Sequence, residues 1–264
     1  MKSDLLRFDD WTSPVPPVRR EVLQAMPAAD EDLPPLLFVP GLGHGAWAFA
    51  EHWLAQAASR GFPAHALSPR AHGDFRAYAH DLVQVAASLP RQVVLVGHGA
   101  GALIVARALA RYPARAAVLV APVLDGWTTL GAALRANFFG TLPAVFGAPL
   151  RFSRRQLFSA DLPVAEADAY RERLRPAGAK AQRQLVTHGS VARPVGNPPV
   201  LVVGSPDDRV VPRASLDRTA ARYGGAPLLF PGMGHDLMLD AGWVEPIDAI
   251  LDWLTKELAT ARAA

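Results

Sequence analysis

Short apolar runs alternate with helical patterns along most of this 264-residue chain. The clearest run, Val93–Val96, leads directly into the glycine-rich turn Gly97–Gly101, and an apolar helical pattern covers Ala100–Arg111. Four consecutive apolar residues are typical of a strand that is covered on both faces. Since strands that alternate with helices usually form a mainly parallel sheet flanked by helices, the pattern predicts an α/β fold.

The same alternation predicts the remaining elements on both sides of one long interruption. Strands are expected over 18–26, 36–39, 64–67, 93–96, 116–120, 200–203 and 228–230, and helices over 47–60, 78–88, 100–111, 214–223 and 243–259. The chain is long enough for one large domain with an insertion.

The interruption, residues 123–195, contains many aromatic, proline and glycine residues, with ten basic and five acidic side chains. We expect it to form a helical cap inserted into a core made of residues 1–122 and 196–264. Its positive charge fits either a solvated helical surface or a lid that attracts an acidic substrate or carrier. Three of its aromatic residues, Trp127, Phe138 and Phe139, are predicted to line a pocket between cap and sheet.

Composition excludes several classes of protein. The absence of cysteine excludes disulfides, thiolate metal sites, iron–sulfur clusters and a cysteine nucleophile. A net charge of +3 is too small to indicate a nucleic-acid-binding protein. The N-terminus has no apolar run typical of a signal peptide, and the most apolar helical stretch is shorter than the ~20 residues of a membrane span. We therefore expect a cytoplasmic protein with a small-molecule substrate and no membrane partner; its oligomeric state stays open.

Parallel sheets bind ligands at the carboxyl ends of their strands, so the loops that follow the strands carry the expected site. The first such loop, residues 40–47, is rich in glycine and can expose N–H groups toward a developing oxyanion. The turn after 93–96 has the form of the G-x-S-x-G nucleophile elbow, but its central residue is Gly99. Without a side chain, Gly99 cannot act as a nucleophile, an acid or a base.

Two later loops supply a histidine and its candidate carboxylates. His235 follows the last predicted strand, and Asp207 and Asp208 follow the strand before it. In a catalytic triad, a carboxylate fixes the tautomer of a histidine that acts as the base. The order of elbow, acid and histidine along the chain is that of the α/β-hydrolases. Both aspartates are candidates for the acid.

The chain resembles the α/β-hydrolase superfamily, and within it the small esterase and hydroxynitrile-lyase-like branch. The resemblance covers PGLGHGAWAF at 40–49, LSPRAHGD at 67–74, LVGHGAGA at 95–102, GSPDDRVVP at 204–212 and GMGHDLMLD at 232–240. It implies an oxyanion hole formed by the N–H groups of Leu42 and Ala100, with His235 as base. It favours Asp208 over Asp207 as the acid, because the family's acid usually precedes an Arg-x-Val-Pro-like run. No cofactor is needed for such chemistry.

Three positions depart from the family's motifs. Gly99 replaces the nucleophilic serine, and Ala71 and Ala102 stand where glycines are usual. Several changes together favour natural drift away from ester hydrolysis over a single engineered knockout. The chain is then expected to act on a small to medium apolar carbonyl compound, such as an ester, thioester or β-keto compound. It would be a lyase-, decarboxylase- or cyclase-like enzyme or a very weak hydrolase. The alternatives are an esterase inactivated at position 99 and a non-catalytic ligand-binding protein.

The other chemically interesting residues give weaker signals. GHGAGA fits the dinucleotide-binding pattern, but no acid follows about 20 residues later, as that fold requires. The histidines show no metal-binding spacing, so no metal is expected. His44 and His98 lie in the motif loops and are candidate pocket residues. Ser68 and Ser205 are minor candidates for a replacement nucleophile.

Overall fold

A computed structural model describes residues 15–16, 18–29, 32–71 and 73–263. The N-terminal stretch that bears on a signal peptide lies outside these residues. A seven-stranded sheet with the strand order β1-β3-β2-β4-β5-β6-β7 forms the centre of the structure. All neighbouring strands are parallel except β1, which pairs antiparallel with β3. The strands are β1 Val22–Ala25, β2 Leu36–Val39, β3 Ala64–Leu67, β4 Val94–His98, β5 Ala116–Val120, β6 Val200–Gly204 and β7 Leu228–Leu229.

Strand β4, which carries the elbow at its end, lies between β2 and β5. Every residue of β4 is buried, as expected for a strand that is covered on both faces. The prediction of a mainly parallel α/β sheet flanked by helices is therefore confirmed.

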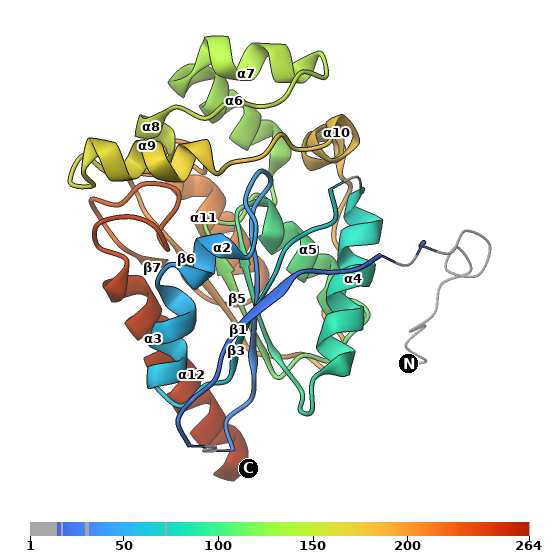
Figure 1. The fold of residues 1–264 in the computed structure, drawn as a ribbon. Coiled ribbons are helices and arrows are strands. Elements are labelled where there is room, and N and C mark those ends of the chain that lie inside the picture. Colours follow the sequence, from blue (N-terminus) through green and yellow to red (C-terminus); the bar gives the residue numbers. More distant parts are fainter. Residues whose placement is uncertain (1–14, 17, 30–31, 72, 264) are drawn as a thin grey trace.

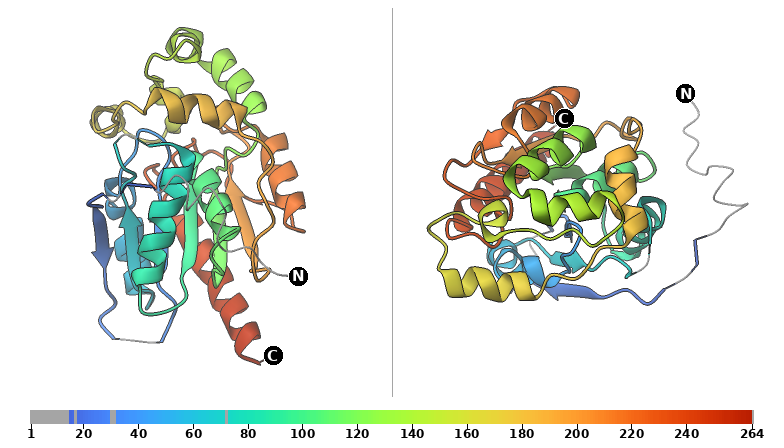
Figure 2. Two further views of the ribbon diagram at one scale, coloured as in Figure 1. Left: turned by 90° about the vertical axis from the view of Figure 1, so that its right-hand side faces the viewer. Right: turned by 90° about the horizontal axis from the view of Figure 1, so that it is seen from above.

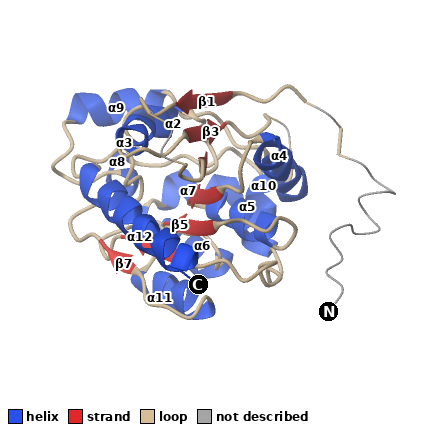
Figure 3. Ribbon diagram, turned by 90° about the horizontal axis from the view of Figure 1, so that it is seen from below, coloured by secondary structure: helices blue, strands red, loops and turns tan. Residues whose placement is uncertain are grey.

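Helices pack on both faces of the sheet (Figure 3). Helices α3 and α12 share one hydrophobic core with the sheet, and α4, α5 and α11 share the other. The helices of this core region are α2 Trp47–Ala50, α3 Trp53–Ser59, α4 Phe75–Ser88, α5 Ala100–Leu109, α11 Arg213–Arg222 and α12 Val244–Ala263.

The helix predicted over 47–60 is interrupted and forms the two helices α2 and α3. His52, with φ −137° and ψ −55°, leaves the helical conformation between them. Its ring stacks on Trp243 with a centroid distance of 4.5 Å. Packing against the start of α12 thus accompanies a break that the apolar pattern does not show.

Five short helices lie between β5 and β6 in the sequence, and we call α6–α10 the inserted helices. Figures 1 and 2 show them together at one end of the molecule, opposite the C-terminal end of α12. No helix within the described residues is both long and apolar enough to cross a bilayer. The inserted helices are α6 Gly126–Ala136, α7 Phe138–Val145, α8 Arg154–Leu157, α9 Val164–Glu172 and α10 Ala179–Thr187.

Candidate active site

The elbow predicted from the sequence lies in the turn between β4 and α5. Gly99 adopts φ +56° and ψ −119°, a conformation that strains any residue with a side chain. Its N–H donates to the Val120 carbonyl at 2.9 Å, and its carbonyl accepts from the Val123 N–H at 3.1 Å. A Cβ atom at Gly101 would collide with the carbonyl oxygens at the end of β2. Close approach of α5 to the sheet therefore accounts for this framing glycine.

His235 and Asp208 form a buried pair beside the elbow. The Nδ1 atom of His235 lies 2.8 Å from Oδ2 of Asp208. The other oxygen, Oδ1, accepts the backbone N–H groups of Val210 and Val211 at 2.6 and 3.0 Å. These bonds hold the carboxylate so that it fixes the imidazole with Nε2 free to take a proton.

The alternative acid, Asp207, does not join this pair. Its side chain is exposed, and Oδ2 accepts the N–H of Gly232 at 2.7 Å. We call residues 232–240, which contain His235, the histidine loop. Asp207 therefore holds the backbone of the histidine loop, whereas Asp208 orients the imidazole.

The pKa of His235 reflects two opposing influences. Burial lowers it, but the charge and hydrogen bond of Asp208 and the charge of Asp236 outweigh burial, so the pKa lies above 6.5. Because the folded-state pKa is raised, the stability from this site is fully present below about pH 6.5. That contribution is lost as the pH rises through the folded-state pKa, while the fraction of imidazole that can act as a base increases.

We expect the His235 ring to titrate with a midpoint above pH 6.5 in the native protein. Ring nitrogen and carbon-bound proton shifts, followed by NMR against pH, would measure it, with His235→Ala identifying the signals. In Asp208→Asn the midpoint should fall, because the largest influence that raises the pKa is removed while burial stays. A native midpoint at or below 6.5 would contradict the pairing.

Position 99 faces the imidazole of His235. A Cβ atom built on Gly99 would lie 3.2 Å from Nε2 of His235, which is its nearest neighbour. A serine hydroxyl at this position would be within hydrogen-bonding reach of the imidazole. Because a contact of 3.2 Å is closer than ordinary van der Waals contact, a side chain at position 99 would shift the imidazole by a few tenths of an ångström.

Leu42 and Ala100, which the resemblance assigns to an oxyanion hole, both line the cavity beside His235. Ala100 is the first residue of α5, so its N–H belongs to the helix-terminal groups that lack an acceptor within the helix. The loop of Leu42 is closed by a hydrogen bond from the His44 N–H to the Gly41 carbonyl at 3.2 Å. The sheet therefore brings both predicted donors to the same cavity as the base.

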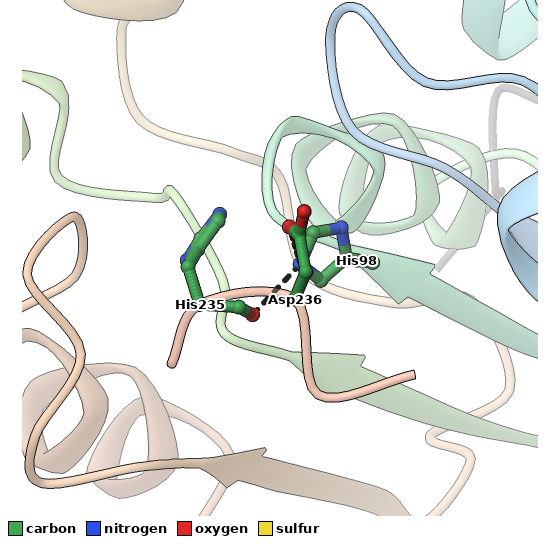
Figure 4. Close-up of side chains that lie close together, drawn as sticks. All are labelled: His98, His235 and Asp236. Atoms are coloured by element: carbon green, nitrogen blue, oxygen red, sulfur yellow. Dashed lines mark hydrogen bonds and ion pairs between the residues drawn. The ribbon is translucent and has the colours of Figure 1, made fainter. Parts of the chain in front are cut away.

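A second buried cluster, formed by His44, His98 and Asp236, lies next to the pair. Oδ2 of Asp236 accepts from Nε2 of His44 at 3.0 Å, and Oδ1 lies 3.5 Å from Nε2 of His98. Nε2 of His98 donates to the carbonyl of His235 at 3.0 Å, as Figure 4 shows. The cluster therefore joins the glycine-rich loop 40–47, the turn at Gly99 and the histidine loop.

The pKa values of this cluster define its charge. Complete burial and the charge of His235 lower the pKa of His98 to about 3, so its ring stays neutral. Burial raises the pKa of Asp236, but His44, followed by the other two histidines, outweighs burial and holds that pKa below its ordinary value. Asp236 is thus an anion among imidazoles. No local sequence pattern indicates this partnership, because the three residues are distant along the chain.

Asp236→Asn should lower the titration midpoint of His235, because it removes a negative charge that raises this pKa. It should also cost about 1–3 kcal/mol of stability, since an amide satisfies His44 less well than a carboxylate. Asp240→Asn is the matched control. Asp240 is equally buried in the same loop but bonds Ser159 and the N–H of Gly234. NMR titration and urea unfolding would check both variants; an equal shift of His235 in the control would refute this role of Asp236.

Ligand atoms of His98, His235 and Asp236 lie within 4.8 Å of one another, close enough to consider a metal ion. Two ring nitrogens in this group already have protein partners, Asp208 for Nδ1 of His235 and the His235 carbonyl for Nε2 of His98. Nδ1 of His98 and Oδ1 of Asp236 are buried without a hydrogen-bond partner among the described residues. The absence of a metal stays a prediction.

A cavity of about 800 Å³ lies between these loops and the inserted helices. His44, His98 and Trp127 line it, as does Thr129, whose buried hydroxyl has no partner among the described residues. The prediction that Phe138 and Phe139 line the pocket is wrong. Their side chains are 51% and 89% exposed, because this end of α7 turns them outward.

The described residues that line the cavity include basic but no acidic side chains. Two of the cations have partners: Arg171 pairs with Asp168 at 2.9 Å, and Lys180 with Asp74 at 2.6 Å. The cavity wall is otherwise mostly apolar, and its remaining cations are Arg151, Arg175 and Arg183.

Ser68 and Ser205, the minor candidates for a nucleophile, form hydrogen bonds that stabilise the loops around them. The hydroxyl of Ser68 accepts the N–H of Ala46 and donates to Glu21. The hydroxyl of Ser205 accepts the N–H of Asp207 at 3.1 Å. Neither serine is part of the described cavity wall.

Comparisons with known proteins agree with this fold. Residues 36–250 match the model of the alpha/beta hydrolase family. The structure is similar to the monoacylglycerol lipase of Paleococcus ferrophilus, with TM-score 0.67 and 17% identity over 91% of this chain and 100% of that one. It is also similar to the bromoperoxidase of Bacillus anthracis, with TM-score 0.65 and 17% identity over 90% of this chain and 94% of that one. The esterase RhEst1 of Rhodococcus sp. ECU1013 matches with TM-score 0.64 and 19% identity over 89% of this chain and 94% of that one. At these identities the structural likeness shows the fold alone. The search of curated proteins finds no significant match.

Proposed function

We propose, since the chain belongs to the alpha/beta hydrolase family, that it is an enzyme that transforms small to medium apolar carbonyl compounds without a serine nucleophile. The observation that carries this proposal is the space at Gly99. A base oriented by Asp208 faces a position 3.2 Å away that has no side chain. The imidazole therefore has no protein hydroxyl to activate there and is free to act on the substrate itself.

The chemistry that fits these groups is proton transfer next to a carbonyl. In this mechanism, Nε2 of His235 removes a proton from the substrate, and the electron pair moves to the carbonyl oxygen. The N–H groups of Leu42 and Ala100 stabilise the resulting oxyanion. The imidazolium, stabilised by Asp208, then returns the proton. In a decarboxylation the same oxyanion forms when the bond to the carboxylate breaks and CO₂ leaves, and the imidazolium then protonates the enolate carbon. No covalent bond to the protein forms in either case, so lyase-, decarboxylase- or cyclase-like reactions fit better than ester hydrolysis.

The cavity supports an apolar substrate that carries a negative charge. Its volume suits a small to medium ligand, and its wall is mostly apolar. Arg151, Arg175 and Arg183 have no ion pair within the described chain, so an anionic group there would meet unpaired cations. In this proposal residues 123–195 act as a cap that closes the cavity and favours a carboxylate substrate.

A second candidate is an ester hydrolase that has lost its serine. The retained elbow conformation at Gly99, with φ +56°, favours it, because that backbone serves to lift a nucleophile above the sheet. The two candidates differ in whether the native glycine protein has an activity that depends on His235.

Exchange of carbon-bound protons for deuterium in benzylacetone, followed by NMR in D₂O, tests the proposal. Decarboxylation of phenyl-substituted β-keto acids is followed in parallel. The native protein should accelerate at least one of these reactions, and His235→Ala should abolish the acceleration. His80→Ala, on the partly exposed face of α4, serves as the control. Equal rates for the native protein and His235→Ala with every probe would reject proton-transfer chemistry.

A further inference from the structure

A second pocket, of about 380 Å³, is rich in arginine, and we call it the arginine pocket. Arg154 and Arg155, at the start of α8, and Arg209, after β6, line it. None of these guanidinium groups has a hydrogen bond or ion pair within the described part of the chain. Arg155 and Arg209 are exposed and Arg154 is half-buried, so all three are accessible to an anion from solution.

The pocket has little negative charge of its own. Asp207 is the acidic residue among its described lining residues, and its Oδ2 accepts the N–H of Gly232 at 2.7 Å. No ion pair within the described residues joins Asp207 to the three arginines. One carboxylate against three guanidinium groups leaves a net charge of +2 on the lining itself. Behind the lining, the buried carboxylate of Asp240 accepts from the Ser159 hydroxyl and the Gly234 N–H.

The pocket is separate from the catalytic cavity but lies against the same loops. The two share no lining residue. Arg209 directly follows Asp208, and Gly234 directly precedes His235. The end of α8 is fastened to the histidine loop, because the Asp236 N–H donates to the Leu157 carbonyl at 2.9 Å. Figure 1 shows α8 above the loops at the ends of β6 and β7.

We propose that the arginine pocket binds a phosphoryl dianion. A phosphate monoester, with about two negative charges near pH 7, matches the charge of +2 on the lining, and its oxygens accept the paired N–H groups of arginine. A single carboxylate carries half that charge. The ligand is therefore free phosphate or a molecule that carries a phosphoryl group, held on the side of the histidine loop away from the catalytic cavity.

Calorimetric titration at constant ionic strength tests this site with three probes: inorganic phosphate, phenyl phosphate and adenosine diphosphate. The native protein should bind at least one probe saturably, at one site per chain. Arg154→Gln and Arg209→Gln should each weaken binding about tenfold or more, because each removes a charged contact. The probe bound most tightly distinguishes free phosphate from a phosphomonoester and a diphosphate.

Two arginine variants serve as controls. Arg183→Gln removes a cation from the catalytic cavity, and Arg135→Gln removes an exposed cation that lines neither pocket. Both should bind the probe as the native protein does, and so should His235→Ala, since this site does not depend on the proposed reaction. The proposal is overturned if no probe binds saturably, if the double variant Arg154→Gln/Arg209→Gln binds normally, or if Arg183→Gln abolishes binding.

Discussion

Gly99→Ser should raise the hydrolysis of a short-chain p-nitrophenyl ester by about three orders of magnitude or more. The expected gain follows from the geometry, because the new Cβ would lie 3.2 Å from Nε2 of His235. In the proposed site His235 is the base and the N–H groups of Leu42 and Ala100 are the oxyanion donors. Loss of a nucleophilic serine costs on the order of 10⁶ in turnover in serine hydrolases. Steady-state rates of the native protein and the variant, measured side by side, check this result.

One further variant separates the effect of the hydroxyl from that of the backbone strain. Gly99→Ala adds the Cβ without the nucleophile and should leave hydrolysis at the native level. Both substitutions should cost about 1–3 kcal/mol of stability, since φ +56° strains an L-residue. Urea unfolding measures that cost. If well-folded Gly99→Ser hydrolysed the ester no faster than Gly99→Ala, the site would not be a serine-hydrolase site that lacks only its nucleophile.

In the serine form, Asp208→Asn should lower kcat by about four orders of magnitude. The amide can still accept the N–H groups of Val210 and Val211, so the loop should keep its shape. It cannot stabilise the imidazolium that forms when His235 accepts the serine proton. The loss should therefore appear in kcat, with little change in KM, because Asp208 is not part of the described cavity wall.

Asp207→Asn is the matched control for this prediction. The two aspartates are neighbours in the chain, and only Asp208 contacts the imidazole. The control should keep kcat within a few-fold of the serine form. A similar loss in both variants would show that the loop, and not the charge at Asp208, supports the reaction.

The sheet and the order of the site loops could be predicted from local patterns. Strands of continuous apolar residues are visible as runs, and glycine turns mark the places where the chain leaves a strand. Helix 47–60 was less predictable, because its break at His52 accompanies a contact with Trp243 that is distant in sequence.

The sequence by itself determined the fold class, the loops that carry the site and the absence of a nucleophile at position 99. These properties follow from residue type and spacing along the chain. Only the tertiary structure decided which aspartate reaches His235, because Asp207 and Asp208 differ in direction and not in composition. It also turned Phe139 outward and placed Asp236 between two histidines. Such contacts depend on how segments that are distant in sequence pack against each other. The periodicity of apolar residues within one segment does not indicate which residue of another segment a side chain will contact.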